Sequence, residues 1–348
     1  MIKIGIFLPN WIGDAVMATP ALRAVRRKFP EAELVGIHRP YISEVLAGTE
    51  LIDRSLLYDK NSPEAEHHGL SFAMHLRREQ FDLILLLTNS LRTGWLAWLS
   101  GAKRRVGYAN EGRGWLLTDP LPGFHRSTVR SALDNYLELV EHLGCDVSSK
   151  RTELTTLSKD ETQWAAFLCT LDEELTRMPI VTLNPGGAFG EAKHWPSQHF
   201  AELARRIVDG YHKTVVVMCG PAERDIAREI VRLSNRPRVV SLADRTLSIG
   251  LSKAAVKHSE LLITTDSGPR HFAQPFGTPV VTLFGPTHIG YSETYYEKSV
   301  HLQLKVDCGP CQERTCPLGH HRCMTDLSVD RVFRAVQIEF DAMRRWVA

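Results

Sequence analysis

Short runs of consecutive apolar residues recur along the chain, and the segments between them place apolar residues at helical spacing. Such runs are typical of buried strands when they are flanked by turn residues. We expect strands at residues 2–8, 33–38, 53–58, 82–87 and 104–108, and again at 179–184, 213–219, 238–241, 260–264 and 279–284. Strands that alternate with helices in this way predict parallel sheets with helices on their faces.

Helical periodicity is clearest in residues 129–143 and 329–346, where the apolar side chains fall on one side. A further helix should follow the first strand and run to about Phe29. Pro20 should kink that helix or restart it after Thr19, because proline cannot donate the backbone hydrogen bond that a helix interior requires.

A polar stretch, residues 144–159, divides the pattern into two halves and has the composition of a linker. Because the strand–helix alternation restarts after it, the sequence predicts an α/β fold with two doubly wound, Rossmann-like domains, residues 1–155 and 156–348. A length of 348 residues is typical of two domains. We expect the last helix, about 328–346, to pack back on the first domain.

Hydrophobic residues make up 43% of the chain and charged residues 24%, which is ordinary for soluble globular proteins. The N-terminal segment lacks the basic and apolar regions of a signal peptide, and no apolar run approaches the ~18 residues of a membrane-spanning helix. We therefore expect a cytoplasmic protein, and peripheral contact with a membrane surface stays open.

Charge is distributed unevenly, although the formal net charge is only +2. From residue 92 to residue 130 the chain has two acidic residues and seven basic ones, Arg92, Lys103, Arg104, Arg105, Arg113, Arg126 and Arg130. This region is either an ordinary solvated face or a site for an acidic acceptor or a membrane surface. Trp95 and Trp98 lie on a short apolar segment within it, and we expect both to be buried, with contact to a membrane as the alternative.

The segment 261–286 predicts a strand, an acidic turn, a short helix and a second strand. Asp266 or Ser267 can cap this helix, and Pro269 fits its first turn. The unpaired N–H groups at the start of the helix form an anion site, and Gly268 allows a ligand to approach the backbone. A carboxylate beside an anion site suggests that the ligand also carries sugar hydroxyls, as a nucleotide sugar or a sugar phosphate does.

Other turns also follow predicted strands, where open parallel sheets bind their ligands. They are residues 9–14, 184–195, 220–223 and 285–287. Turns from two facing domains can line one cleft, which favours an enzyme. Asp14, in the first of these turns, is either the N-cap of a helix or a general base.

Glycines expose backbone N–H groups in residues 184–190, directly after a predicted strand, and Lys193 follows with an ammonium group. Together these groups are typical of a diphosphate site. Glu223, after the next strand, either accepts hydrogen bonds from a ribose diol or simply begins a helix.

Four cysteines near the C-terminus have the spacing C-x2-C-x4-C-x6-C, with His320 and His321 in the last gap. They are Cys308, Cys311, Cys316 and Cys323. The spacing is not a standard zinc pattern, and a reducing compartment disfavours disulfides. We expect packed free thiols, and a structural metal or a local disulfide stays open.

Several segments carry a resemblance that extends over nearly the whole chain: LPNWIGDAVMATPALRAVR, TNSLRTGWLAWLSGAKRRVGYANEGRGWLLTD, NPGGAFGEAKHWP, GPAERD, TTDSGPRHFAQPFGTPVVTLFGPT and CGPCQERTCPLGHHRCM. On these segments the chain resembles the ADP-heptose:lipopolysaccharide heptosyltransferases of glycosyltransferase family 9, most of all their heptosyltransferase II branch. The resemblance implies a GT-B fold, in which two domains face each other across a cleft. The N-terminal domain would bind the acceptor and the C-terminal domain the ADP-sugar.

The resemblance also implies inverting transfer of heptose from ADP-heptose to a heptose hydroxyl of the lipopolysaccharide inner core, with no obligatory metal or other cofactor. Asp14 would be the general base. The donor site would comprise Lys193, Glu223, Asp266, Ser267, Gly268, Gly187 and Thr287. Arg270 departs from the family pattern, where Met or Leu is more usual, and either adds a charge near the donor or points to solvent.

We expect the acceptor, a lipid A–core molecule at the membrane surface, to contact Arg92, Arg104, Arg105 and Arg113, although each of these could instead only solubilise the surface. Neither a nucleic acid nor a stable protein partner is expected. Two other functions stay open. One is transfer from another nucleotide sugar by the same scaffold, and the other is binding of sugar nucleotides without catalysis.

Overall fold

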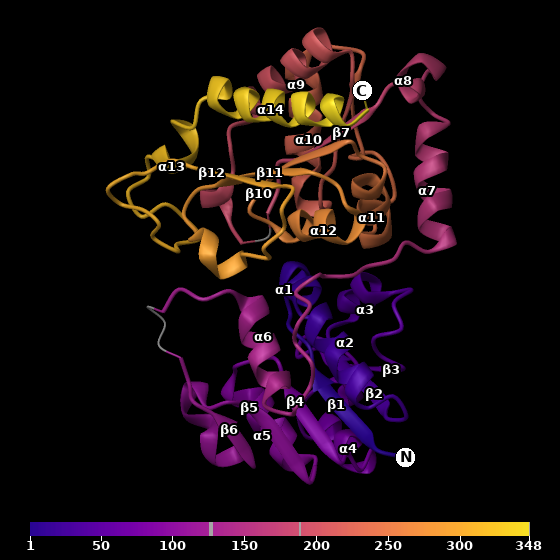
Figure 1. Cartoon of the computed structure of the whole chain (residues 1–348), viewed down its shortest axis with the longest axis vertical. Helices are drawn as coiled ribbons and strands as arrows, with labels where there is room; N and C mark the ends of the chain where they lie inside the picture. The colour runs from indigo at the N-terminus through magenta and orange to yellow at the C-terminus, as the bar shows by residue number, and fades with distance from the viewer. Residues whose placement is uncertain (125–127, 188, 348) are drawn as a thin grey trace. The chain divides into compact units, whose positions relative to one another are not determined.

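The computed structural model describes residues 1–124, 128–187 and 189–347, so Arg126 of the predicted basic region lies outside the described residues. The chain forms two compact units (Figure 1). Unit 1 consists of Met1–Thr155 and Gly290–Tyr295, and unit 2 of Thr156–Ile289 and Tyr296–Ala348. Residues 145–157, within the expected linker, connect the two units as an irregular segment.

Unit 1 contains a parallel sheet with the strand order β3-β2-β1-β4-β5-β6. Its strands are β1 Lys3–Phe7, β2 Glu33–His38, β3 Arg54–Leu57, β4 Leu83–Leu86, β5 Arg104–Tyr108 and β6 Asp119–Leu121. In the register of the central strands, Ile4 lies opposite Leu34 of β2 and Leu83 of β4. The five strands expected in this half are confirmed. The additional strand β6 was not predicted, because it is only three residues long and contains Pro120.

The helices of unit 1 are α1 Ile12–Met17, α2 Thr19–Lys28, α3 Pro40–Leu46, α4 Gly69–Arg78, α5 Leu91–Leu99 and α6 Ala132–Glu141, with short 3-10 turns η1 Ala65–His67 and η2 Asn110–Leu116. The restart expected at Pro20 is confirmed, since α2 begins at Thr19 with proline in its first turn. Helices α4 and α5 cover one face of the sheet, where Phe72, Leu76 and Leu96 pack in the core. Trp95 and Trp98 face outward and are 39% and 45% exposed, so the expectation that they are buried is wrong.

Unit 2 repeats this architecture with the strand order β12-β11-β10-β7-β8-β9. Its strands are β7 Ile180–Asn184, β8 Thr214–Val217, β9 Val239–Ser241, β10 Leu261–Thr265, β11 Val280–Phe284 and β12 Ser299–Gln303. Every residue of β7, β8, β10 and β11 is buried, as expected for parallel strands with helices on both faces. The edge strand β12 was not predicted, because its residues are only partly buried and its pattern is weakly apolar.

The helices of unit 2 are α7 Ser158–Leu168, α8 Glu173–Arg177, α9 Ser197–Tyr211, α10 Arg224–Ser234, α11 Ile249–Lys257, α12 Ala273–Phe276, α13 Arg322–Thr325 and α14 Val329–Val347. Unit 2 also contains the short 3-10 turns η3 Glu191–Lys193, η4 Pro221–Glu223 and η5 Gly268–Phe272, whereas η6 Ile289–Ser292 begins at the end of unit 2 and continues into the Gly290–Tyr295 segment of unit 1. Among the described residues, no helix combines the length and the apolar character needed to cross a bilayer.

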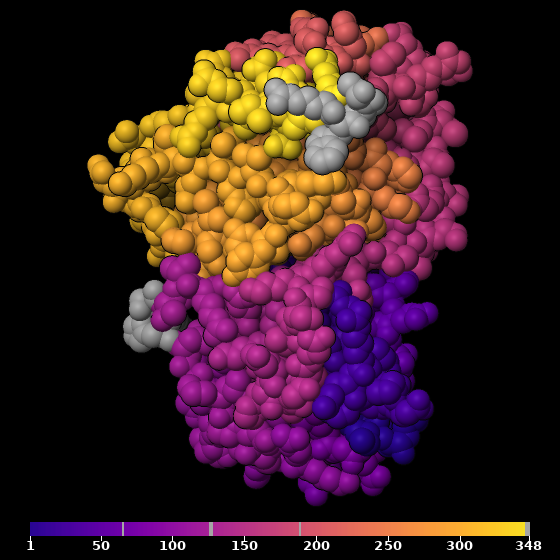
Figure 2. Space-filling model, viewed as in Figure 1, coloured from indigo at the N-terminus to yellow at the C-terminus, as the bar shows by residue number. Residues whose placement is uncertain are grey.

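The long C-terminal helix α14 lies on the surface of unit 2 (Figure 2). Its side chains Val332, Val336 and Phe340 are buried in the core of unit 2, and Phe340 packs against Tyr211 of α9 at 4.7 Å between ring centroids. The expectation that this helix also packs on the first domain stays a prediction. Its apolar side is already occupied by its own unit.

The strand order reverses direction at one point in each sheet, between β1 and β4 in unit 1 and between β7 and β10 in unit 2. The connections after these neighbouring strands leave in opposite directions, which opens a crevice at their carboxyl ends where doubly wound folds bind ligands. The prediction of two doubly wound domains is thus confirmed, and the turns after these four strands are the expected ligand sites.

Candidate functional site

In unit 2, the loop after β7 and the turn after β10 are tied together by side-chain hydrogen bonds. Asn184 Nδ2 donates to Thr264 Oγ1 at 2.9 Å and to Ser267 Oγ at 2.7 Å. Thr265 Oγ1 donates to the carbonyl oxygen of Gly186 at 2.6 Å. The glycine-rich loop and the acidic turn, which are 80 residues apart in sequence, therefore form one rigid structure at the switch point of the sheet.

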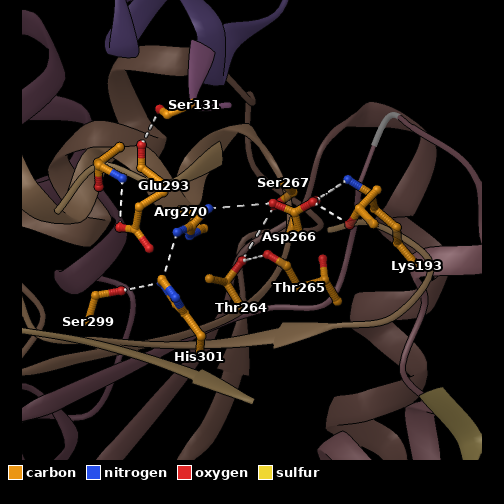
Figure 3. Close-up of polar contacts among 12 residues, drawn as sticks. Ser131, Lys193, Thr264, Thr265, Asp266, Ser267, Arg270, Glu293, Ser299 and His301 are labelled. Atoms are coloured by element: carbon orange, nitrogen blue, oxygen red, sulfur yellow. Dashed lines mark hydrogen bonds and ion pairs between the residues drawn. The ribbon is translucent and has the colours of Figure 1, made fainter. Parts of the chain in front are cut away.

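A buried ion pair lies beside these loops (Figure 3). Lys193 Nζ donates to Asp266 Oδ2 at 2.6 Å and to the carbonyl oxygen of Asp266 at 2.8 Å. Thr287 Oγ1 donates to the same carboxylate oxygen at 2.7 Å. Burial opposes ionisation of Asp266, but the charges of Lys193 and Arg270 and these hydrogen bonds outweigh it and lower its pKa to about 2.

Two of the three N–H bonds of Lys193 are therefore used by Asp266. Among the described residues, the other contact of its ammonium group is the ring of Phe189, whose centroid is 4.5 Å away. One N–H direction is left for an external acceptor. We interpret Asp266 as the group that positions Lys193, since its carboxylate already holds Lys193 and Thr287.

Arg270 is 3% exposed and its Nη1 lies 3.6 Å from Asp266 Oδ1, so the alternative that it points to solvent is wrong. Its Nη2 contacts His301 Nε2 at 2.9 Å, and Ser299 Oγ contacts the same nitrogen at 2.7 Å (Figure 3). A guanidinium group can only donate, so Nε2 accepts this hydrogen bond. His301 is therefore neutral and orients Arg270. Sequence reasoning missed His301 because it lies on the unpredicted strand β12.

Arg270 and Lys193 both stabilise the ionised carboxylate of Asp266, so loss of Arg270 should change how strongly Lys193 binds a second anion. In Arg270→Met, Lys193 alone would neutralise the buried carboxylate and would be less available to a second anion. We expect the Kd for ADP, measured by calorimetry, to rise about tenfold, which corresponds to ~1.4 kcal/mol. Arg270→Lys, which keeps the charge, is the matched control. An unchanged Kd in Arg270→Met would show that Arg270 has no influence on the site.

The backbone around Gly186 approaches Glu223 closely, since a Cβ atom added at Gly186 would lie 2.8 Å from the Glu223 side chain. Glu223 Oε2 accepts the N–H of Gly220 at 2.7 Å, and the residue precedes α10. Glu223 therefore does begin a helix, which is one of the two roles expected for it. Within the described part of the chain, Oε1 of Glu223 accepts no hydrogen bond, so a second role in binding a diol is compatible with this geometry.

In unit 1, Asp14 follows β1 at the switch point of the sheet. It is the third residue of α1, and Trp11 occupies the N-cap position, so the interpretation of Asp14 as the cap is wrong. Tyr136 of α6 donates its hydroxyl hydrogen bond to the Asp14 side chain. Burial, together with the charge of Asp14 and this hydrogen bond, raises the pKa of Tyr136 well above 10. Tyr136, which sequence reasoning missed, is therefore a permanent donor to Asp14.

The four arginines expected to bind the acceptor lie in different surroundings. Arg113 is fully buried, and its guanidinium donates to the carbonyl oxygens of Tyr108 at 2.8 Å and Ser90 at 3.1 Å. Burial lowers its pKa to about 10, in spite of the nearby Glu111. The acceptor role predicted for Arg113 is corrected to that of a structural residue that ties the turn after β4 to the segment after β5.

Arg104 and Arg105 begin β5, so they lie at the amino-terminal edge of the sheet, opposite the edge of Asp14. Arg104 pairs with Asp119 at 2.6 Å, and Arg105 donates to the carbonyl oxygens of Leu116 and Ala102. Arg92 lies in the first turn of α5, after the carboxyl end of β4, and has an exposed side chain, a combination that the other three lack. The structure therefore leaves Arg92 as the best candidate among them for acceptor contact.

The four clustered cysteines are free thiols, three of them in the segment between β12 and α13 and the fourth, Cys323, within α13. Burial raises the pKa of Cys323, and the other three thiols add to this effect. Backbone N–H groups around Cys316 lower its pKa. In the described ranges, the side chains close enough to share a metal ion are Glu64, Glu66 and His67. Cys308 is exposed and the other three are partly buried, so the expected packing of all four stays a prediction, and a structural metal or a local disulfide stays the alternative.

Comparison with known proteins places this geometry in a family. Residues 70–322 match the model described as glycosyltransferase family 9 (heptosyltransferase). Lipooligosaccharide heptosyltransferase 2 of Campylobacter jejuni (strain 81116) is 26% identical over 340 residues, which cover 96% of this chain and 98% of that protein. The sequence similarity thus includes the segments that carry both candidate sites.

Solved structures show the same architecture. The Escherichia coli ADP-heptose LPS heptosyltransferase II structure has a TM-score of 0.79 at 21% identity and covers 99% of this chain and 100% of that chain. A glycosyltransferase family 9 structure from Veillonella parvula has a TM-score of 0.80 at 22% identity, with 97% coverage of both chains. The predicted GT-B fold class is confirmed by these likenesses.

Proposed function

Because the chain belongs to glycosyltransferase family 9, the heptosyltransferases, we propose that it transfers heptose from ADP-heptose to a heptose hydroxyl of the lipopolysaccharide inner core, with inversion. The names of similar proteins support this proposal. The Campylobacter relative is a lipooligosaccharide heptosyltransferase, and the Escherichia coli structure is described as an ADP-heptose LPS heptosyltransferase.

The observation that carries the donor proposal is the Lys193–Asp266–Thr287 cluster at the switch point of unit 2. It presents an ammonium group, held by two hydrogen bonds, beside a glycine-rich loop and the start of η5. A diphosphate offers acceptor oxygens for the remaining N–H of Lys193 and for backbone N–H groups at Ser267 and Gly268. Gly187 lies next to this turn, since a Cβ atom added there would lie 3.6 Å from Cβ of Ser267, in ordinary contact.

In the proposed reaction, an acceptor hydroxyl oxygen forms a bond to the anomeric carbon of the donor and loses its proton to Asp14. The bond between the anomeric carbon and the diphosphate oxygen breaks, and ADP leaves with its electron pair. Lys193 and the N–H groups of the turn stabilise the charge that develops on the diphosphate. We propose that these groups make a metal unnecessary, and transfer should then persist in the presence of a chelator.

Tyr136 should act as a positioning residue for Asp14. Its hydrogen bond favours the ionised carboxylate, so its loss in Tyr136→Phe makes protonation of the base easier. We expect the acidic limb of the kcat/KM profile to move to higher pH and kcat to fall by about tenfold. Tyr58→Phe, which removes the hydroxyl of a half-buried tyrosine of unit 1 whose ring packs against Phe72, is the control. A profile that does not move would assign Tyr136 a purely structural role.

The chemical identity of the donor is tested by a panel of nucleotide sugars with the purified protein and a heptose-bearing core acceptor. The proposal predicts transfer from ADP-heptose and little from UDP- or GDP-sugars. Preference for another donor would support a different glycosyltransferase on the same scaffold. Binding of ADP-heptose without transfer to any acceptor and without slow hydrolysis would support a non-catalytic binding protein.

A further inference from the structure

An unusual surface lies on the outer side of α4, α5 and η2 in unit 1. We call it the tryptophan face, and it consists of six exposed apolar residues: Leu70 (69% exposed), Met74 (49%), Leu91 (37%), Trp95 (39%), Trp98 (45%) and Trp115 (64%). Large side chains of this kind rarely gather in the open on a monomeric soluble protein. Such a patch is typical of an interaction surface.

The helical geometry explains why these side chains share one side. Leu91, Trp95 and Trp98 lie at i, i+4 and i+7 on α5, whereas Leu96 and Ala97 turn inward to the core. The Trp95 ring lies edge-to-face with Trp98 at 5.5 Å and with Trp115 of η2 at 5.1 Å. The three indoles therefore form one aromatic cluster that stands outside the core.

Leu70 and Met74 occupy positions i and i+4 on α4, which contacts α5 and lies beside it in unit 1 (Figure 1). The charges on these elements are predominantly positive. Arg77, Arg78 and Arg92 are exposed, and the acidic residue of α4, α5 and η2 is Glu111, which accepts the backbone N–H of Leu91 at 2.9 Å. Indoles and arginines together make the face complementary to an anionic, partly apolar surface.

We propose that the tryptophan face docks on the surface of a bilayer that contains anionic lipids. Tryptophan prefers the membrane–water interface, where its ring is apolar and its N–H is hydrated, and arginines are attracted to anionic headgroups. Helix α5 has nine residues, so it would lie in the plane of the interface. The docking is independent of the donor chemistry. Only its consequence, that the enzyme meets a lipid-anchored acceptor there, rests on the proposed function.

A second copy of this chain is the alternative occupant of the face. A two-fold contact through the tryptophan face would bring the same elements of both copies together, and with them Arg77, Arg78 and Arg92 of each copy. Like charges at such a contact are unfavourable, whereas the same arginines favour anionic lipid. The charge of the face therefore argues for the membrane.

The test is co-sedimentation of the full chain with vesicles of phosphatidylcholine alone and with vesicles that contain phosphatidylglycerol. We expect binding to the anionic vesicles, weakened by salt, with a blue shift of tryptophan emission. Trp98→Glu/Trp115→Glu should lower the apparent affinity by at least about tenfold, because two exposed indoles that insert would become acidic. Ile338→Glu, a matched change of an exposed apolar residue on α14 of unit 2, should bind like the wild type.

Trp98→Ser/Trp115→Ser serves as a second variant without added negative charge, and thermal melts show whether both variants stay folded. Wild-type binding by both double variants would overturn the proposal. So would absence of vesicle binding by the wild type, or a dimer in sedimentation equilibrium that these substitutions dissociate. None of these readouts uses ADP-heptose, so loss of docking and loss of the transfer function are distinguishable.

Discussion

Asp14→Asn is expected to lower kcat for heptose transfer by about 10²- to 10⁴-fold, the range that a positioned general base contributes. An asparagine side chain can still accept the hydrogen bond of Tyr136, so the local structure is retained, but it cannot take up the proton of the acceptor hydroxyl. ADP is bound by unit 2 in this proposal. Its Kd should therefore stay within about twofold of the wild-type value.

Steady-state kinetics and calorimetry on the same preparations check this expectation. Asp341→Asn, the same chemical change at an exposed position of α14, is the matched control and should leave both quantities unchanged. Turnover by Asp14→Asn at the wild-type rate would remove Asp14 from the role of base. A parallel loss of ADP binding would instead indicate damage to the fold.

Lys193→Ala is expected to weaken ADP binding by about 10- to 100-fold, since a charge-assisted hydrogen bond to the diphosphate is worth roughly 1.5–3 kcal/mol. The rate of transfer should fall as well, because the same ammonium stabilises the leaving diphosphate. Calorimetry with ADP and kinetics at saturating donor measure the two effects separately. Lys305→Ala, an exposed lysine of unit 2, is the control.

The variant also leaves Asp266 buried with one cation fewer, which destabilises the protein in its own right. Lys193→Ala/Asp266→Asn removes the carboxylate that has lost its hydrogen bond from Lys193, and so separates this effect from loss of the phosphate contact. If the double variant regains stability but not ADP affinity, Lys193 binds the phosphate directly. Normal ADP affinity in Lys193→Ala would show that the diphosphate is bound elsewhere.

Most of the fold could be predicted, because the strands of a parallel sheet are continuous apolar runs that stand out from amphipathic helices. The exceptions are the edge strands β6 and β12, which are short or only partly buried. The partner of α14 could not be predicted either. Its apolar positions show which side is buried, but they do not show that α9 covers that side.

The candidate donor site was largely predictable as a set of residues, because turns after parallel strands converge at one edge of a sheet. The contacts between these residues could not be predicted from the sequence. The ion pair between Lys193 and Asp266 joins residues 73 positions apart, and the pairing of Arg270 with His301 depends on an unpredicted strand. Sequence patterns show the types of side chain present, whereas these pairings depend on tertiary structure.

Burial was the least predictable property in the first half of the chain. Arg113 is enclosed because backbone carbonyl groups satisfy its guanidinium, and no local pattern shows this. Trp95 and Trp98 were expected inside because tryptophan usually is, yet α5 turns its smaller residues toward the sheet. Both deviations concern unit 1, the half of the chain that the family resemblance assigns to the acceptor.

The most direct test of the proposed function is a single-turnover measurement with ADP-heptose at saturating concentration and a heptose-bearing core acceptor. For each equivalent of acceptor consumed, wild-type protein should form one equivalent of glycosylated product and one of ADP, with inversion at the anomeric carbon. Asp14→Asn should bind the donor equally well and form product at least about 10²-fold more slowly. Failure of the wild type to transfer heptose, or equal product formation by Asp14→Asn, would contradict the mechanism proposed for this enzyme.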